Sequence, residues 1–239
     1  MKNSIEFKVW GRYAMFTDPI TKLGGEKCSY HIPTYEALKG VAKSIYWKPT
    51  FIWIIDRVRI IKRIQTQTKG IKPLDYSTGG NSLAIYNYLS DVEYQVQAHF
   101  EWNHYRPELE NDRIDGKHHS IAKRMLEKGG RQDIFLGTRD CQGYVEPCQF
   151  GEGESYYSEI EEISFGFMFH GFDYPDETGK NEFHSRFWYP KMVHGIIEFL
   201  PPKECQIKKF VREMSPKKFL PHKNFTGIRE EGLVDELGE

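Results

Sequence analysis

The sequence predicts an α+β protein built on an antiparallel sheet. Residues 92–102 alternate apolar and polar side chains, a pattern that predicts a half-buried strand. Residues 38–45 instead repeat apolar side chains at helical spacing. Along the chain, the predicted elements follow the order β, α, β, β, α, β. This order is typical of a ferredoxin-like (RRM-like) domain, in which helices cover one face of a sheet.

The first predicted elements are a strand, a helix and a second strand. Apolar and polar residues alternate over residues 4–10. Thr34 is the expected N-cap of the helix, because its hydroxyl can accept a hydrogen bond from the first turn. Pro49 stops this helix. Residues 51–61 are apolar and rich in β-branched side chains, which predicts a buried strand. The polar segment that follows predicts a hairpin or a loop.

A second helix and a fourth strand complete the first predicted domain. Residues 118–128 carry Ile, Ala and Met on one helical face. Gly129 and Gly130 are the expected C-terminal cap, because glycine adopts the left-handed conformation without steric cost. Residues 133–137 predict a short strand. We therefore expect residues 1–147 to form the ferredoxin-like domain.

Residues 148–239 are expected to form a small antiparallel β-sheet domain with a C-terminal tail. Residues 163–169 and 186–199 read as strands, and the polar residues 173–179 between them predict a turn. The sequence therefore predicts two consecutive domains of unequal size.

Charge is unevenly distributed along a chain whose formal net charge is −1. Residues 57–72 carry six Lys or Arg and no acid, and residues 113–131 carry six against two acids. Residues 146–162 carry six Glu and no Lys or Arg. Basic strips of this kind favour a polyanionic partner. They are equally typical of solvated surfaces, so charge alone leaves both interpretations open.

The cysteines and the hydropathy pattern indicate a cytoplasmic protein. The four cysteines form no CxxC pair, and no His or Cys cluster has zinc-site spacing. No apolar run approaches the roughly 20 residues of a membrane span, and no leader-like apolar segment opens the chain. We therefore expect no membrane partner, no metal and no cofactor.

The densest group of candidate catalytic residues precedes the second helix. Arg113, Lys117, His118 and His119 lie within seven residues, around Gly116. Backbone N–H groups at a helix N-terminus favour phosphate. A His can move a proton at neutral pH, and a Lys can stabilise the extra charge of a phosphorane, so the pair suits attack by an RNA 2′-hydroxyl. The alternative is that these are ordinary exposed loop residues.

Two weaker candidates are a tyrosine and an acidic cluster. Tyr46, at the end of the first helix, could hydrogen-bond a 2′-hydroxyl or stack on a base, although a tyrosine in this position is usually structural. Glu159, Glu161 and Glu162 could hold a metal, but a solvated acidic turn explains them better.

Several longer blocks then combine into one pattern. They are YAMFTDP at 13–19, GGEK at 24–27, PTYEALKG at 33–40, SIYWKPT at 44–50, DGKHHS at 115–120, GGRQDIFLG at 129–137, CQGYV at 141–145 and HGFDYPDETG at 170–179. Together these blocks resemble the Cas-five family of subtype I-C CRISPR systems (the d, or Dvulg, type). The resemblance runs from residue 6 to about 200.

This resemblance implies a metal-independent endoribonuclease that processes CRISPR repeat precursor RNA. Its product would carry a 2′,3′-cyclic phosphate, and the protein would stay on the crRNA 5′ handle among the other type I-C Cascade subunits. The family's catalytic Tyr, Lys and His fall on Tyr46, Lys117 and His118, and His119 could share the proton transfer.

Further RNA contacts are expected from the basic residues around the second helix. These are Arg113, His119, Lys123, Arg124 and Arg131. The alternative function is a non-catalytic subunit that clamps the crRNA handle. DNA binding, the repeat sequence and the cut position stay open.

Overall fold

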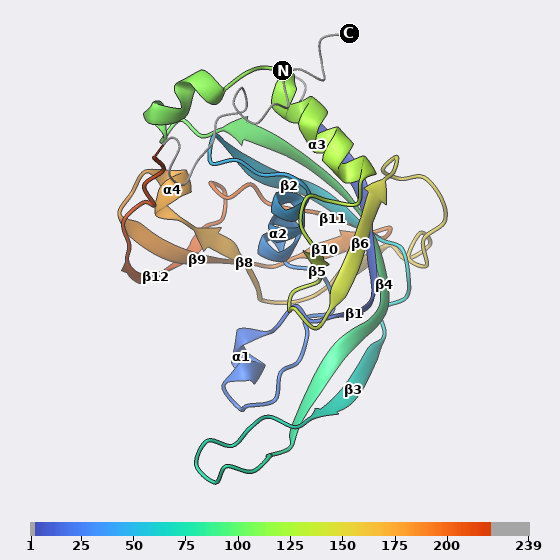
Figure 1. Cartoon of the computed structure of the whole chain (residues 1–239). Coiled ribbons are helices and arrows are strands. Elements are labelled where there is room, and N and C mark those ends of the chain that lie inside the picture. The colour runs from blue at the N-terminus through green and yellow to red at the C-terminus, as the bar shows by residue number, and fades with distance from the viewer. Residues whose placement is uncertain (1–2, 221–239) are drawn as a thin grey trace.

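The computed structural model describes residues 3–220, which form a mixed α+β structure with two antiparallel sheets (Figure 1). The helices are α1 (Pro19–Lys22), α2 (Tyr35–Ile45), the 3₁₀ helix η1 (Pro107–Asp112), α3 (Lys117–Glu127) and α4 (Pro175–Thr178). The strands are β1 (Ser4–Ala14), β2 (Phe51–Ile60), β3 (Thr66–Ile71), β4 (Ala84–Trp102), β5 (Ile134–Phe135), β6 (Gln142–Pro147), β7 (Glu162–Ser164), β8 (Met168–Asp173), β9 (Glu182–Trp188), β10 (Lys191–Val193), β11 (Ile196–Glu198) and β12 (Ile207–Glu213).

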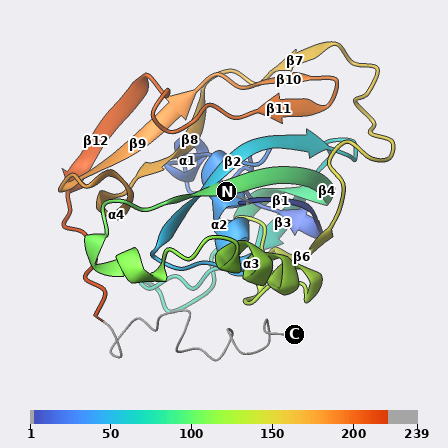
Figure 2. The same ribbon diagram turned by 90° about the horizontal axis from the view of Figure 1, so that it is seen from above.

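The larger sheet has the strand order β5-β6-β1-β4-β2-β11-β10-β7, and β3 pairs with β4 outside this path. Its centre is the long antiparallel pair of β1 and β4, in which Phe7 lies opposite Val96. Helices α2 and α3 pack on the same face of this sheet (Figure 2). The alternation predicted for the first and third strands is confirmed, because the apolar residues of β1 and β4 are the buried ones.

Helix α2 forms as the sequence predicts. The Thr34 hydroxyl caps it by accepting a hydrogen bond from the backbone N–H of Ala37 at 3.2 Å. The apolar residues at helical spacing are buried against the sheet. The helix ends where Tyr46 adopts an extended backbone (φ −162°, ψ 134°). Consequently Tyr46 and Trp47 point in different directions as the chain leaves the helix.

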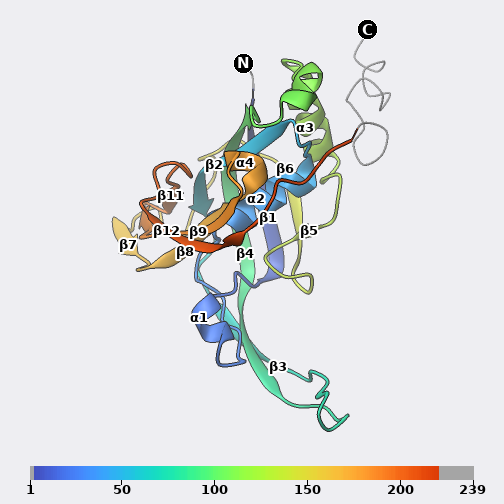
Figure 3. The same ribbon diagram turned by 90° about the vertical axis from the view of Figure 1, so that its left-hand side faces the viewer.

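The hairpin predicted after β2 is larger than the sequence pattern indicated. Strand β4 begins at Ala84, eight residues before the predicted start, and β3 pairs with this early part. The two strands project from the body of the protein as an arm (Figure 3). Strand β6 was not predicted, since in Gln142–Pro147 only Gly143 and Val145 are buried and a two-residue alternation gives little signal.

The second half of the chain contributes to both sheets. The smaller sheet has the order β12-β9-β8, in agreement with the expected small antiparallel sheet. However, β7, β10 and β11 extend the larger sheet beyond β2, so the two sheets do not separate at residue 147. The strand predicted over 186–199 is broken by a turn in which His194 and Gly195 both have positive φ (49° and 81°).

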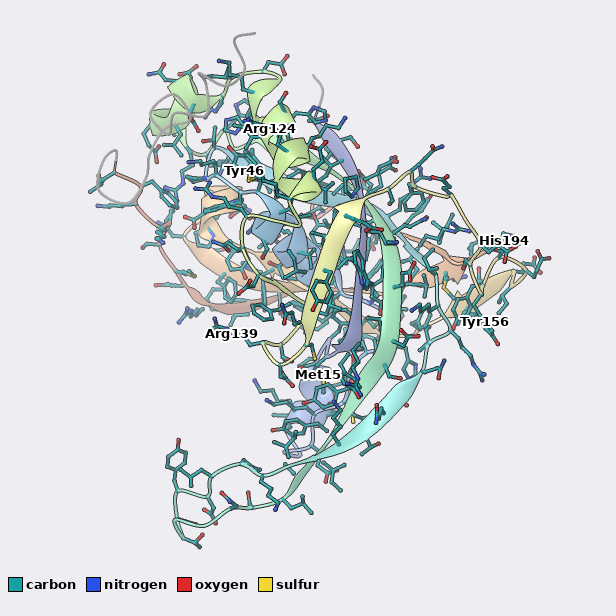
Figure 4. The ribbon with its side chains drawn as sticks, turned by 45° about the vertical axis from the view of Figure 1, so that its right-hand side comes forward. Met15, Tyr46, Arg124, Arg139, Tyr156 and His194 are labelled. Atoms are coloured by element: carbon teal, nitrogen blue, oxygen red, sulfur yellow. The ribbon has the colours of Figure 1, made fainter. Side chains whose placement is uncertain are left out.

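Gly137, shortly after β5, packs its backbone directly against the backbone of Met15, at the end of β1. Its φ is +96°, and an added Cβ would lie 2.0 Å from the carbonyl oxygen of Met15. The backbone N–H of Met15 donates to Leu136 O at 2.9 Å in the same place, and Figure 4 labels Met15 at this junction. Only glycine fits this close backbone approach.

A buried ion-pair network joins α2 to α4. Lys39 is 1% exposed and forms an ion pair with Glu177, which also pairs with Lys43 at 3.3 Å. Burial alone would raise the pKa of the Glu177 carboxyl, but the two ammonium groups hold that pKa below its usual value. A buried charge left without its partner is strongly destabilising, so this network fixes how the turn after β8 sits on α2.

A second buried polar residue, His170 on β8, makes the fold sensitive to acid. Its ring stacks on Tyr35 at a centroid distance of 4.4 Å, and its Nε2 lies 2.9 Å from the carbonyl oxygen of Leu200. Burial, reinforced by the neighbouring Arg186 guanidinium, lowers the pKa of His170 to about 3. In the unfolded chain a histidine has a pKa of about 6.5. Between these values the unfolded chain binds one proton more than the folded protein.

We therefore expect the free energy of unfolding to fall as the pH decreases below about 6.5, with His170 contributing up to about 1.4 kcal/mol per pH unit. The variant His170→Gln should lose this contribution, so its urea-unfolding free energies at pH 6 and pH 4.5 should differ less than those of the wild type. The same substitution at the exposed residue His104 is the control. Equal slopes in all three proteins would contradict the assignment.

Candidate active site

The candidate site lies where the end of α2 meets the start of α3. Tyr46 directly follows α2, and Lys117 and His118 are the first two residues of α3. Gly116 precedes the helix with φ 75°, a conformation that glycine adopts without strain. Figure 4 labels Tyr46 beneath α3, close to the end of α2. The fold thus brings together three residues from segments about 70 positions apart.

A buried hydrogen bond joins Tyr46 to His118. The Tyr46 hydroxyl lies 3.0 Å from His118 Nδ1, and both side chains are 0% exposed. The imidazole is enclosed by aromatic rings, with centroids 5.3 Å away for Phe51 and 5.5 Å away for Trp102. This apolar enclosure strengthens the hydrogen bond, because little water competes for either partner.

The second ring nitrogen fixes the proton on the imidazole. His118 Nε2 lies 2.6 Å from the carbonyl oxygen of Asp112, an atom that can only accept. Nε2 therefore carries the hydrogen, and in the neutral ring Nδ1 presents its lone pair to the Tyr46 hydroxyl. Tyr46 consequently donates its proton toward His118. This arrangement can take up the tyrosine proton and return it.

Sequence reasoning missed three residues that hold this pair. The Thr50 hydroxyl donates to Asp112 Oδ2 at 2.5 Å, and the same carboxylate oxygen lies 3.6 Å from His118 Nε2. The Trp53 indole N–H donates to the Tyr46 carbonyl at 2.8 Å. Asp112 is 7% exposed, and a buried carboxylate next to a histidine was the signal available, but the sequence pattern gives no burial at this position.

Lys117 lies on a neighbouring, more exposed face of α3 than His118. Neighbouring residues on a helix lie about 100° apart, so Lys117 is on the surface while His118 faces the core. Within residues 3–220 it forms no ion pair, and its ammonium group can meet an incoming phosphate. It also lies in the first turn of α3, where backbone N–H groups favour negative charge.

The predicted RNA-binding residues fall in two groups. Lys123 and Arg131 are exposed, and His119 has its Nε2 2.9 Å from the Ser4 carbonyl at the same end of the molecule. Arg113 instead donates to the carbonyl oxygens of Asn103 and Arg106, at 3.0 Å and 2.8 Å. Its guanidinium thus holds the loop before η1. Arg124 is half-buried on α3 (Figure 4).

Two cations of the basic strip at residues 57–72 already have partners within the protein. Arg59 is 7% exposed and donates to the backbone carbonyls of Glu152 and Gly153, at 3.1 Å and 2.8 Å. Lys62 pairs with Asp91 at 2.7 Å. These partners favour α3 over this strip as the surface for a polyanion.

Two further features concern metals and membranes. In the acidic segment, Glu162 forms an ion pair with Lys191 at 2.9 Å. Among residues 3–220, no group of three His, Cys, Asp or Glu side chains is arranged to hold a metal ion.

In the same residues, no helix has both the length and the apolar character needed to cross a membrane.

Comparison with known proteins places the chain in a family. Residues 4–200 match the family model Cas_Cas5d, described as CRISPR-associated protein (Cas_Cas5). An antiparallel α+β fold of this kind, with this match over most of its length, defines a CRISPR-associated protein. The chain belongs to the Cas5d family.

Named relatives and solved structures agree with this assignment. The chain is 27% identical over 236 residues to "CRISPR pre-crRNA endoribonuclease Cas5d" of Mannheimia succiniciproducens, covering 87% of this chain and all of that protein. A protein of the same name from Thermus thermophilus is 31% identical over 156 residues, covering 60% of this chain and 63% of that protein.

Two solved structures have the same fold. A "CRISPR-associated Protein" crystal structure is 37% identical with a TM-score of 0.73, covering 86% of this chain and 96% of that one. The functionally uncharacterized protein SMU1763c from Streptococcus mutans is 39% identical with a TM-score of 0.72, with the same coverage of both chains.

The buried hydrogen bond of the Tyr46 hydroxyl leads to a prediction about stability. We expect Tyr46→Phe to lower the free energy of unfolding by about 1–3 kcal/mol, because His118 Nδ1 loses a buried hydrogen bond while the ring packing is kept. Urea unfolding measures this loss. The exposed Tyr144→Phe should change stability by less than about 0.5 kcal/mol. Equal effects would show that the Tyr46 hydroxyl does not stabilise the fold.

Proposed function

We propose that this protein is a metal-independent endoribonuclease that cuts precursor CRISPR RNA within the repeat. The observation that carries the proposal is the hydrogen bond between Tyr46 and His118, with the available ammonium group of Lys117 at the same helix end. Membership of a family with relatives named pre-crRNA endoribonuclease supports it. The strand order β6-β1-β4-β2, with two helices on one face, fits the ferredoxin-like domain expected for such an enzyme.

The proposed chemistry needs no external nucleophile. The RNA 2′-oxygen attacks the adjacent phosphorus, and the bond from phosphorus to the 5′-oxygen breaks. Tyr46 takes the 2′-hydroxyl proton as its own proton passes to His118 Nδ1, and Lys117 stabilises the charge on the phosphorane. The departing 5′-oxygen gains a proton, so the net reaction moves one proton from the 2′-oxygen to the 5′-oxygen. The products are a 2′,3′-cyclic phosphate and a 5′-hydroxyl.

One observation favours a second candidate, a non-catalytic subunit that clamps the crRNA handle. Tyr46 and His118 are both 0% exposed, so an RNA substrate reaches them only if the surrounding segments move. In either case we propose that the protein remains on the 5′ handle, in contact with the other subunits of a type I-C Cascade complex. Phosphate contacts from Lys123 and Arg131 would then provide much of the affinity.

Incubation of the purified protein with its own repeat RNA in excess EDTA tests the proposal. We expect cleavage to a 2′,3′-cyclic phosphate and a 5′-hydroxyl, because the nucleophile belongs to the substrate. Replacing the nucleotide 5′ of the cut with its 2′-deoxy form should abolish cleavage and leave binding intact. Efficient cleavage of the deoxy substrate would rule out the internal nucleophile. Binding without any cleavage of the all-ribose RNA would favour the handle-binding function.

Substitutions test the assigned residues. Lys117→Ala and His118→Ala should slow single-turnover cleavage by about 10²–10⁴-fold, the range typical of lost acid–base or electrostatic catalysis. Their affinity for the repeat should stay within about tenfold of the wild type, since many phosphate contacts remain. The neighbouring His119→Ala is the matched variant and should cleave at a nearly normal rate. Loss of cleavage in His119→Ala alone would move the proton-transfer role to that residue.

A further inference from the structure

Trp47 lies directly beside the proposed catalytic tyrosine but faces outward. Because the backbone at Tyr46 is extended, consecutive side chains point to opposite sides, and Trp47 is 36% exposed where Tyr46 is 0% exposed. The Lys43 ammonium lies 5.8 Å from the Trp47 ring centroid. A partly exposed indole next to a cation is the kind of surface on which nucleobases stack.

An aromatic side chain from the far end of the described chain contacts this indole, which stays 36% exposed. The Phe219 ring centroid lies 6.3 Å from that of Trp47, with the rings edge to face, and Phe219 is 9% exposed. Arg106 and Lys217 place their cationic groups 5.0 Å and 5.5 Å from the Phe219 ring centroid. Phe219 thus lies edge to face against the indole, with two cationic groups beside its own ring, and takes up part of the space next to Trp47.

The segment that carries Phe219 crosses from the small sheet to the candidate site. After β12 it passes α4 and runs toward the end of the molecule with η1 and α3 (Figures 1 and 3). Two backbone hydrogen bonds hold it. The N–H of Met214 donates to the Asn181 carbonyl at 3.1 Å, and the N–H of Lys217 donates to Asp176 Oδ1 at 2.6 Å. It belongs to no helix or strand, so it can be displaced without breaking a sheet.

The nearby carboxylates position the cations and do not cover the indole. Arg106 pairs with Asp176 and with Glu108, and Lys43 pairs with Glu177. These pairs hold the guanidinium and the ammonium beside the two rings. A phosphate arriving next to a stacked base would find these cations already in place.

We propose that Trp47 is a nucleobase-stacking residue for single-stranded RNA next to the cut, and that Phe219 occupies this stacking position in the free protein. The inference rests on the proposed function and extends it to substrate positioning. RNA binding then exchanges the aromatic contact between Phe219 and Trp47 for one between a base and Trp47. Phe219 therefore competes with the RNA substrate, whereas Trp47 binds that substrate.

The two substitutions should act in opposite directions. The probe is the repeat RNA with the 2′-deoxy nucleotide at the cut, carrying 2-aminopurine in turn at each nucleotide flanking it. Trp47→Ala should weaken equilibrium binding by about tenfold, in line with the loss of one base stack, and Trp47→Phe should restore most of it. Phe219→Ala should tighten binding by several-fold, because the competitor is gone. A residue that merely supports the fold would weaken binding when removed.

Fluorescence and a double substitution make the test specific. One 2-aminopurine position should be quenched on binding to the wild type and not on binding to Trp47→Ala. In the Trp47→Ala background, Phe219→Ala should have no further effect on affinity, since the two groups compete for one place. Phe210→Ala, an exposed aromatic residue on β12, is the matched control and should bind as the wild type. Thermal unfolding of each variant confirms that it is folded.

The outcomes separate this inference from the proposed enzymatic function. If Trp47→Ala and Phe219→Ala both weaken binding, or if neither changes affinity or quenching, the stacking site is refuted even when the wild type cleaves its repeat. If the opposite effects and the quenching appear while the wild type fails to cleave the all-ribose RNA, the stacking site stands and the catalytic proposal falls.

Discussion

The candidate site depends on the cost of burying a histidine. His118 is 0% exposed, so both ring nitrogens need partners, and a buried polar atom left unpaired costs about 1–3 kcal/mol. The partners come from two separate segments, the hydroxyl of Tyr46 after α2 and the carbonyl of Asp112 at the end of η1. Pairing both nitrogens of this one ring therefore fixes the end of α2, the end of η1 and the start of α3 relative to one another. The lysine at the start of α3 gains a defined place from the same constraint.

This arrangement explains how a site can be preorganised and closed at once. The aromatic enclosure that strengthens the Tyr46–His118 hydrogen bond also keeps solvent and substrate away. A site that is assembled before its ligand arrives needs no reorganisation when the ligand binds, but part of the enclosure must move to admit the ligand. The irregular chain after β12 takes no part in either sheet and contacts the outward-facing Trp47, on the other side of the backbone from Tyr46.

The sequence predicted features that depend on local physics and missed those that depend on distant pairing. The alternation in β1 and the Thr34 cap could each be read from a few neighbouring residues, and the same kind of local pattern made Lys117 and His118 candidates. Tyr46 was only a weak candidate from the residues themselves and became a catalytic candidate through the family resemblance, because its partner is 72 residues away. Asp112 could not be found, since it binds the histidine through its backbone carbonyl. The pairing of β11 with β2 likewise could not be predicted, because the sequence does not show which edge of the sheet is available for another strand.

The charge pattern, too, could not be interpreted without knowing which distant segments meet. In the fold it indicates where a polyanion can bind. In the sequence, the basic residues 57–72 and the acidic residues 146–162 look like opposite faces of a polarised molecule. In the fold they meet, because the guanidinium of Arg59 donates to backbone carbonyls within the acidic segment. Arg59 of that basic strip therefore joins β2 to the chain beyond β6. The exposed cations that remain near the candidate site lie on and just after α3, so a polyanion drawn to them arrives beside Tyr46 and Trp47.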